Sequence, residues 1–185
     1  MYKAAVRWMI RRNIDRLNAG DHRPTLAMFA PNAVMSFPGD NSWSNQHRAP
    51  RTGTQPSLSH RGVDEIEAFL VRYVGTGMQM TVEDILVNGP PWNTRAAVRV
   101  HHWAPGADDT VAYQNRAVLM VTTSWGRIRT QEDYEDTVRV AAYDEILAAE
   151  GATEDRASAE AEDEAGEVGR RETVDAAPAR SAASA

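Results

Sequence analysis

The order of the predicted elements constrains this chain most strongly, because helical periods come first and strand-like segments come last. Four segments with strand character follow one another, with short turns between them, at 78–87, 94–103, 111–123 and 127–136. Strands joined by short turns pair antiparallel. Helices followed by such a run of strands predict an α+β fold, in which helices pack on one face of a curved, mainly antiparallel sheet.

Helical patterns predict three helices before the sheet and a short one after it. The first runs from the start of the chain to about residue 17, because arginines take much of one face and apolar residues recur at helical spacing on the other: Val6, Met9, Ile10, Ile14 and Leu17. Gly20 suits its end, since glycine adopts the left-handed conformation that closes a helix. The remaining elements are helices at 24–29, 63–74 and 138–149 and a short strand at 34–37.

Residues 38–61 show no steady period and are rich in Gly, Pro, Ser, Asn and Arg. A stretch of this length without regular structure is uncommon in a compact domain, and it is either a lid-like loop or an irregular edge. The residues leave both alternatives open.

The net charge of −6 comes from the C-terminal end of the chain. Ten of the 26 acidic residues and four of the 20 basic ones lie from residue 150 onward, which leaves sixteen of each sign in the rest of the chain. Residues 151–185 contain almost no large apolar side chain, so we expect a disordered acidic Ala/Glu-rich tail after one domain at 1–150. The balanced charge of that domain offers no electrostatic footprint for nucleic acid, and no nucleic-acid partner is predicted.

The chain contains no cysteine, which excludes disulfides and thiolate chemistry. No stretch approaches transmembrane length, and the arginine-bearing start has no apolar core typical of a signal peptide. We therefore expect a cytoplasmic protein without membrane contact.

Five parts of the chain resemble the SnoaL-like, or nuclear-transport-factor-2-like, superfamily: Leu17–Asp21, Phe29–Gly39, Arg61–Gly62 with Ile66–Leu70, Asn88–Trp92 and Trp125–Thr137. The resemblance covers roughly residues 2–147. It implies a cone-shaped roll, with three N-terminal helices on a strongly curved sheet and a short C-terminal helix, and it implies a homodimer. Superfamily enzymes act as hydrolases, isomerases or cyclases, but the fold alone does not specify a reaction, because it supports many.

Ketosteroid isomerases belong to this superfamily, and their catalytic positions correspond here to Asn13, Phe37 and Ala117. The resemblance would place an oxyanion-hole tyrosine at the first, a base carboxylate at the second and an oxyanion-hole acid near the third. All three groups are missing, and a phenylalanine cannot abstract a proton. Steroid isomerisation by that mechanism is not predicted.

The resemblance to limonene epoxide hydrolase extends further. The last-strand aspartate of that family corresponds to Asp133 and, with a one-residue insertion in the turn, its central-strand arginine and acid correspond to Arg99 and His101. Its water-holding residues fall at Met35 and Phe37, so that pair is absent. The similarity therefore implies an acid–base set without the groups that hold the attacking water.

Strand alternation places Arg99, His101 and Trp103 on one face of the segment 94–103. If that face points into the cone, Arg99 and His101 converge with Asp133. We then expect Asp133 to act as base, His101 as acid or proton shuttle, and Arg99 as the cation that orients the carboxylate. A buried ion pair without a catalytic role is the structural alternative.

An apolar cavity with a few polar groups is the usual form of a small-ligand site. Its predicted lining is Met35, Phe37, Trp103, Tyr113, Asn115, Ala117 and Leu119. No metal site is predicted, because neighbouring strand residues such as His101 and His102 point to opposite faces and cannot ligate one ion together. No cofactor is predicted either.

Charged and aromatic residues at the strand ends have simpler interpretations. Glu132, Glu135 and Asp136 are interpreted as solvated charges. Trp92 and Trp125 lie at turns and are interpreted as packing at the sheet end or on a dimer surface, since aromatic residues are favoured at interfaces.

Two functions from different classes remain open. The first is a small-molecule enzyme that performs acid–base chemistry, hydrolysis or isomerisation, on an apolar substrate without a cofactor. The alternative is a non-catalytic protein that uses the cone as a ligand pocket or as a docking surface for another protein, which the loss of both base-type positions on the first strand favours.

Overall fold

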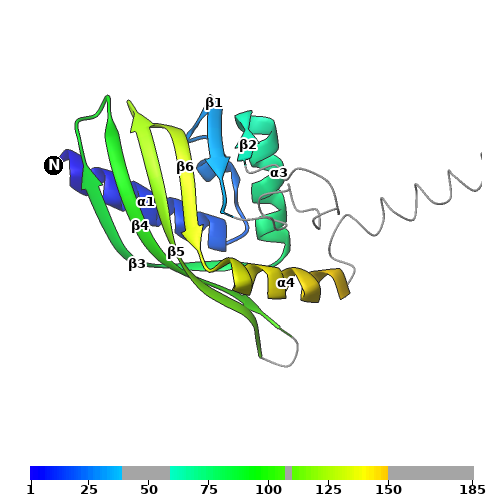
Figure 1. Cartoon of the computed structure of the whole chain (residues 1–185). Helices are drawn as coiled ribbons and strands as arrows, with labels where there is room; N and C mark the ends of the chain where they lie inside the picture. The colour runs from blue at the N-terminus through cyan, green and yellow to red at the C-terminus, as the bar shows by residue number, and fades with distance from the viewer. Residues whose placement is uncertain (39–58, 107–109, 150–185) are drawn as a thin grey trace, which may run out of the picture. The chain divides into compact units, whose positions relative to one another are not determined.

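The computed structural model of this protein describes residues 1–38, 59–106 and 110–149 (Figure 1). The predicted acidic tail and nearly all of the irregular segment 38–61 lie outside the described residues. In chain order the elements are α1 (Tyr2–Asn18), α2 (Arg23–Leu26), β1 (Phe29–Ser36), β2 (Ser59–Arg61), α3 (Gly62–Gly75), β3 (Gln79–Asn88), β4 (Thr94–Pro105), β5 (Val111–Ser124), β6 (Arg127–Glu135) and α4 (Thr137–Ala149).

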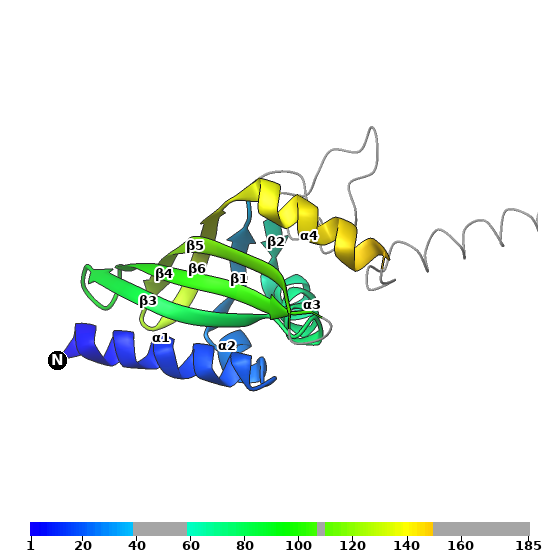
Figure 2. The same cartoon turned by 90° about the horizontal axis from the view of Figure 1, so that it is seen from below.

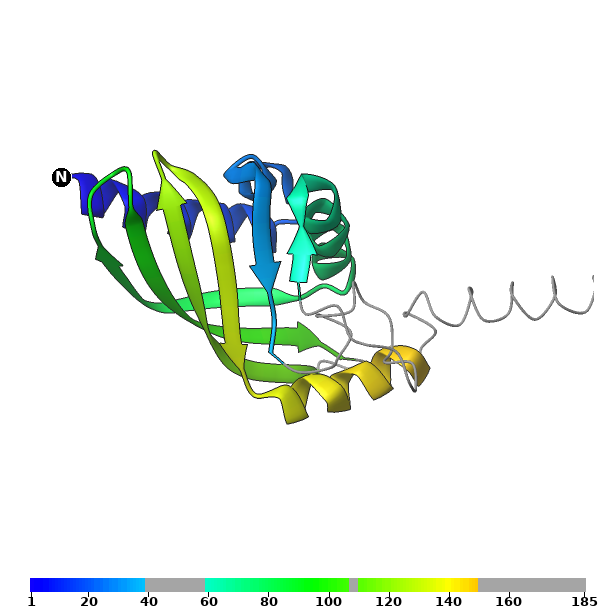
Figure 3. The same cartoon turned by 45° about the horizontal axis from the view of Figure 1, so that its top comes forward.

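The strands form one six-stranded sheet in the order β2-β1-β6-β5-β4-β3. All neighbouring strands are antiparallel except β1 and β6, which pair in parallel. The long strands β3 to β6 bend together, and β1 and β2 continue the sheet beside α3 (Figures 1 and 3). The predicted α+β fold with a strongly curved, mainly antiparallel sheet is confirmed.

Local boundaries differ from prediction around the first strand. Strand β1 begins at Phe29 rather than at residue 34, and the short helix α2 ends at Leu26 rather than at residue 29. The short strand β2 was not expected, because its three residues carry no readable period. It forms because Met35 on β1 pairs with His60. The backbone of β1 supplies hydrogen bonds that the sequence of β2 alone does not predict.

Helices cover the inner, concave face of the sheet. Seen from below, α1 runs along one side of the curved strands (Figure 2). It buries Val6, Ile14 and Leu17 towards the core, as the predicted apolar stripe requires. Helix α4 packs Tyr143 against Tyr113 of β5, with stacked rings whose centroids are 4.7 Å apart.

Burial alternates along the strands and defines the two faces of the sheet. On β4, Val98, Val100 and His102 are buried, whereas Arg99 is exposed and His101 is half-buried. Because successive strand residues point to opposite faces, the first three side chains point inward and the other two outward. This assignment determines which side chains reach the interior of the cone.

No helix within the described residues is both long enough and apolar enough to cross a membrane.

Candidate functional site

A cavity of about 150 Å³ lies between α1 and the concave face of the sheet. Its walls are mainly apolar and include four methionines, Met9, Met28, Met35 and Met80. Methionine side chains adapt readily to irregular ligands, because they are unbranched and polarizable. Among the described residues that line this cavity there is no lysine or arginine.

Strand β6 supplies three polar side chains to the cavity. Gln131, Asp133 and Glu135 alternate along the strand, so all three point inward and line the cavity. The Gln131 side-chain amide donates a hydrogen bond to Asp133 Oδ1 at 3.0 Å. Two carboxyl groups therefore stand two residues apart on one face, within an apolar enclosure.

Asp133 is a buried carboxyl group whose neighbours favour its protonated form. It is 7 % exposed and lies opposite Leu119 in the β5–β6 register. Burial raises its pKa well above the usual range, the negative charge of Glu135 raises it further, and the hydrogen bond from Gln131 opposes the change. Since the charge of Glu135 acts on Asp133, Glu135 ionises first.

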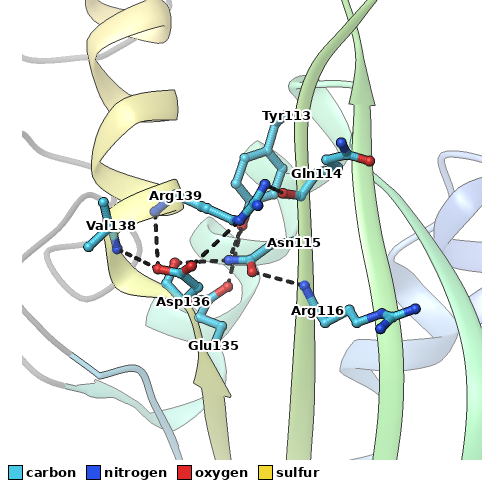
Figure 4. Close-up of polar contacts among 8 residues, drawn as sticks. All are labelled: Tyr113, Gln114, Asn115, Arg116, Glu135, Asp136, Val138 and Arg139. Atoms are coloured by element: carbon cyan, nitrogen blue, oxygen red, sulfur yellow. Dashed lines mark hydrogen bonds and ion pairs between the residues drawn. The ribbon is translucent and has the colours of Figure 1, made fainter.

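Glu135 titrates near neutral pH. Burial is the main cause that raises its pKa to about 7, the hydrogen bond from Tyr113 lowers it, and the charges of Asp144 and Asp136 raise it. The Tyr113 hydroxyl donates to Glu135 Oε2 at 3.4 Å (Figure 4). The two carboxyl groups therefore differ, because Glu135 titrates near neutral pH and ionises before Asp133.

A hydrogen-bonded network joins Glu135 to the start of α4 (Figure 4). The Asn115 amide nitrogen donates at 3.0 Å to the Tyr113 hydroxyl and at 3.0 Å to the backbone carbonyl of Asp136. The Asp136 carboxylate in turn accepts from the backbone N–H of Val138 at 3.0 Å, in the manner of a helix N-cap. Glu135 is thus held by groups from β5 and by the junction with α4.

His102 contributes a neutral imidazole to the same cavity. It is 8 % exposed, its ring meets that of Tyr73 edge-on with centroids 6.1 Å apart, and both side chains line the cavity. Burial, with a smaller contribution from His101, lowers the pKa of His102 to about 4. Its buried Nε2 atom has no hydrogen-bond partner among the described residues, so it is a polar atom that a ligand could satisfy.

The predicted convergence of Arg99 and His101 with Asp133 is wrong in its geometry. Arg99 lies on the outer face, where its guanidinium pairs with Glu83 at 2.9 Å and its side chain is 59 % exposed. His101 lines a separate outer groove beside Arg116. The prediction placed the odd-numbered face of β4 inward, and an error of one residue moves every side chain of a strand to the opposite face.

The predicted lining residues divide into three groups. Met35, Phe37 and Leu119 line the cavity. Tyr113, Asn115 and Ala117 are buried on the inner face of β5, but they lie outside the cavity lining. Trp103 is half-buried on the outer face of β4 and does not reach the cavity.

Two residues of the site were missed or misassigned from the sequence. Glu135 was interpreted as a solvated charge, although alternation from Asp133 places it on the same inner face. His102 was assigned to the outer face together with Val98 and Val100. The apolar character of that set, against the arginines of the other face, was the signal that could have placed it inward.

No group of three His, Cys, Asp or Glu side chains is placed to hold a metal ion within the described residues.

A model of the SnoaL-like domain matches residues 10–131, which is most of the chain. The chain belongs to the SnoaL-like domain family. The predicted resemblance is confirmed, whereas a search of curated proteins found no match.

Solved structures share the fold of this SnoaL-like chain at low sequence identity. The epoxide hydrolase/cyclase-like enzyme SalBIII, with a role in pyran ring formation in polyether salinomycin, is 13 % identical with a TM-score of 0.55, over 74 % of this chain and 95 % of that one. IdmH from Streptomyces antibioticus, a candidate polyketide cyclase, is 18 % identical with a TM-score of 0.53, over 73 % and 94 %.

A third structure, an NTF2-like protein of unknown function from Burkholderia pseudomallei, is 19 % identical with a TM-score of 0.54, over 72 % of this chain and 95 % of that one. At such identities the likeness establishes the fold and leaves the activity of this SnoaL-like protein to its own residues.

Proposed function

We propose that this protein is an acid–base enzyme that acts on a small, uncharged, apolar molecule inside the cone, as a hydrolase or as an isomerase or cyclase. The observation that carries the proposal is the pair of carboxyl groups, Asp133 and Glu135, on the cavity face of β6. An acid and a base with separated pKa values within one site are the usual requirement for coupled proton transfer.

The two carboxyl groups have different environments and hence different roles. Asp133 is the more buried, and burial together with the charge of Glu135 raises its pKa, so it is the second of the two to ionise and serves as the proton donor. Glu135 ionises first, with a pKa of about 7, so it serves as the base. A general acid and base with pKa values close to the working pH transfer protons most efficiently.

The same pair supports two balanced reactions. In epoxide hydrolysis, Asp133 gives its proton to the ring oxygen as the C–O bond breaks, while Glu135 takes a proton from the water that attacks the carbon. In isomerisation, Glu135 removes a proton next to a carbonyl group while Asp133 protonates the carbonyl oxygen. Glu135 then gives its proton to another carbon of the enol, while the enol O–H returns its proton to Asp133. After epoxide hydrolysis Asp133 is ionised and Glu135 is protonated, so transfer of one proton from Glu135 to Asp133 restores the pair. In isomerisation the second step restores both groups directly.

The apolar lining supports an uncharged substrate. Among the described lining residues there is no lysine or arginine to pair with an anion, and the two carboxyl groups disfavour one. A cation would be favoured by ionised Glu135 but would lose its hydration against apolar walls. His102 and Tyr73 add neutral polar groups that can orient an oxygen atom of the ligand.

The test is turnover of uncharged epoxides and enolisable ketones, followed by mass spectrometry or by deuterium exchange, with Asp133→Asn and Glu135→Gln variants. We expect rates to fall by about 10²- to 10⁴-fold in each variant, the usual contribution of a general acid or base. Glu132→Gln is the matched control, because Glu132 is exposed on the outer face of the same strand.

The result also separates the enzyme from its alternative. Wild-type protein that binds the compounds, as seen by a rise in melting temperature, but converts none of them would be a ligand-binding protein. Equal rates in wild type and both cavity variants would remove the assigned roles. Homodimer formation, which the family resemblance suggests, is a separate proposal that sedimentation can test.

A further inference from the structure

We propose that His102 binds a hydroxyl group of the substrate, so the substrate carries a hydroxyl at the end of the molecule opposite to its reacting group. The proposal rests on the proposed function, because it assigns a substrate class to the same cavity. His102 selects and positions the substrate, while Asp133 and Glu135 exchange protons with it.

The Nε2 atom of His102 is a buried polar atom that the protein leaves unsatisfied. The side chain is 8 % exposed and lines the cavity, and Nε2 has no hydrogen-bond partner among the described residues. Buried polar atoms are nearly always hydrogen-bonded, because an unpaired one loses its bond to water without compensation. A polar group supplied by the ligand would account for this atom.

Other polar side chains of the cavity are satisfied by the protein itself. Gln131 donates to the carboxyl group of Asp133 at 3.0 Å. At the other end of β4, the Thr94 hydroxyl donates to the Pro90 carbonyl at 2.8 Å. His102 therefore differs from these groups in what it offers to a ligand.

Strand pairing places His102 at the same end of the sheet as Glu135. Glu135 pairs with Ala117 on β5, and Ala117 pairs with Val100 on β4. His102 follows two residues after Val100, so it is the next inward-facing residue of that strand. The two side chains are therefore two strands and one inward position apart. Both point to the concave side, where the curvature of the sheet brings side chains closer than their backbones.

Tyr73 of α3 lies close to both His102 and the carboxyl pair. Its ring meets the imidazole edge-on, with centroids 6.1 Å apart. Burial is the main cause that raises the pKa of Tyr73 well above its usual value, and nearby charges raise it further: those of Tyr113, Asp133 and Glu135. Such charge effects require proximity, because they weaken with distance. A small ligand beside Tyr73 can therefore reach His102 and the carboxyl groups together.

The volume of the cavity limits the size of this substrate. A cavity of about 150 Å³ with apolar walls can hold a ligand the size of benzene. The substrate class that follows is a single ring or a chain of similar size. It carries the reacting oxygen at one end and the hydroxyl at the other.

A hydroxyl is the polar group that suits Nε2 best. Burial lowers the pKa of His102 to about 4, so the ring is neutral at pH 7. A neutral imidazole has one protonated nitrogen, so Nε2 either donates or accepts, and a hydroxyl satisfies it in both tautomers. An ammonium or carboxylate group would instead bring a charge that apolar walls disfavour.

The experiment compares 4-hydroxycyclohexanone with 4-methylcyclohexanone, two enolisable ketones of nearly equal size. Calorimetry on the full chain measures both dissociation constants for wild type, His102→Phe and the control His101→Phe. We expect wild-type protein to bind the hydroxy ketone about tenfold more tightly, as one satisfied hydrogen bond allows. In His102→Phe the buried hydroxyl has lost its partner, so we expect the order of affinity to reverse.

Two further variants separate the hydrogen bond from effects on folding. His101→Phe makes the same substitution on the same strand, but His101 is half-buried on the outer face and lines the outer groove, so the wild-type order should remain. His102→Gln keeps a donor and an acceptor in its amide, so it should retain part of the preference. The comparison of the two ketones in wild type stands even if His102→Phe fails to fold.

The outcomes separate this proposal from the proposed function. If wild type prefers the methyl ketone, or if His102→Phe keeps the preference for the hydroxy ketone, the role of His102 is wrong. The proposed function survives that result if the ketones exchange deuterium and the exchange depends on Asp133 and Glu135. The predicted order of affinity without deuterium exchange would support the hydroxyl site and overturn the enzyme. If wild type binds neither ketone, both proposals fail.

Discussion

The side-chain amide of Asn115 donates to the Tyr113 hydroxyl oxygen, and this leaves the Tyr113 proton for the carboxylate of Glu135 (Figure 4). The direction of the hydrogen bonds follows from chemistry, since the amide nitrogen can only donate. The same amide also donates to the Asp136 carbonyl, next to the N-cap of α4. Glu135 is thus positioned by residues that do not line the cavity.

We predict that Tyr113→Phe raises the pKa of Glu135 above its value of about 7. The hydrogen bond from Tyr113 favours the charged carboxylate and lowers its pKa, so removal of the donor has the opposite effect. The stability cost should be about 1 kcal/mol, typical of one hydrogen bond. NMR titration of the labelled Glu135 carboxyl carbon measures the pKa, and urea unfolding measures the cost.

Tyr134→Phe is the matched control for that change. Tyr134 is exposed on the outer face of β6, and its hydroxyl donates to Glu132 at 2.9 Å. We expect this variant to leave the Glu135 titration unchanged. A Glu135 pKa that stayed at about 7 in Tyr113→Phe would show that Tyr113 does not position the carboxylate.

Glu135→Gln should change how stability depends on pH. The pKa of Glu135 is raised on folding, from 4.5 to about 7. Its stabilising contribution is therefore complete below pH 4.5 and is lost as pH rises to about 7, because the folded state binds more protons in that interval. The loss is at most about 3 kcal/mol, and partial exposure of the side chain reduces it.

The comparison uses free energies of unfolding by urea at pH 4.5 and 8, for wild type, Glu135→Gln and the outer-face control Glu132→Gln. We expect Glu135→Gln to lose part of the decline that wild type shows with rising pH. If the free energy of unfolding declined equally in all three proteins, ionisation of Glu135 would not reduce the stability of the folded state. Asp133 contributes in the same direction, since its pKa is also raised, so the decline should diminish rather than vanish.

His102→Phe should change the pH dependence of stability in the direction opposite to Glu135→Gln. Burial lowers the pKa of His102 from 6.5 to about 4, so its contribution to stability is complete above pH 6.5 and is lost as pH falls to about 4. Removal of the buried Nε2 atom, which has no partner among the described residues, should also stabilise the protein at pH 8 by about 1 kcal/mol. Urea unfolding between pH 4 and 8 checks both effects. A destabilised variant at pH 8 would show that the imidazole is well satisfied.

The sequence predicts the fold of this protein better than it predicts the candidate site. The order of helices and strands followed from periodicity and turn residues, because these are local properties. Strand β2 could not be predicted, since its hydrogen bonds come from pairing with β1 across a long intervening segment. Pairing between distant segments depends on tertiary contacts that local sequence does not contain.

The faces of β4 illustrate the limit for the site. Alternation correctly grouped Arg99 with His101 and Val98 with His102, but it does not state which group points inward. Resemblance to an epoxide hydrolase, with an assumed one-residue insertion, favoured the arginine face, whereas burial of apolar surface decides the outcome in favour of the valines. Burial also raises the pKa values of the carboxyl groups on β6. The spacing of residues in the sequence does not predict this effect.

Substitution of Arg99 therefore provides a direct check of the face assignment. We predict that Arg99→Ala leaves affinity for cavity ligands such as 4-methylcyclohexanone unchanged within twofold. Its ion pair with Glu83 lies at the surface, so the loss of stability should stay below about 1 kcal/mol. Calorimetric titration and urea unfolding measure the two quantities, and a tenfold loss of affinity would place the guanidinium inside the cone.

Trp125→Asn should stabilise the β5–β6 hairpin. Asparagine adopts positive φ at lower cost than tryptophan, and the observed φ of 52° at this position belongs to that region. The relief is about 1 kcal/mol, and it is offset by loss of an exposed ring contact with Trp92 worth about 0.5 kcal/mol. The net gain should be about 0.5 kcal/mol in urea unfolding, because the two effects partly cancel.

The sign of that change tests why the tryptophan is present. A variant that is more stable indicates that the tryptophan is not retained for the stability of the turn. Trp92→Ala is the companion variant, because it removes the same ring contact but leaves the turn residue unchanged, and it should lose about 0.5 kcal/mol. If Trp125→Asn instead lost more than about 1 kcal/mol, contact between the rings would outweigh the backbone cost, and the indole would serve folding.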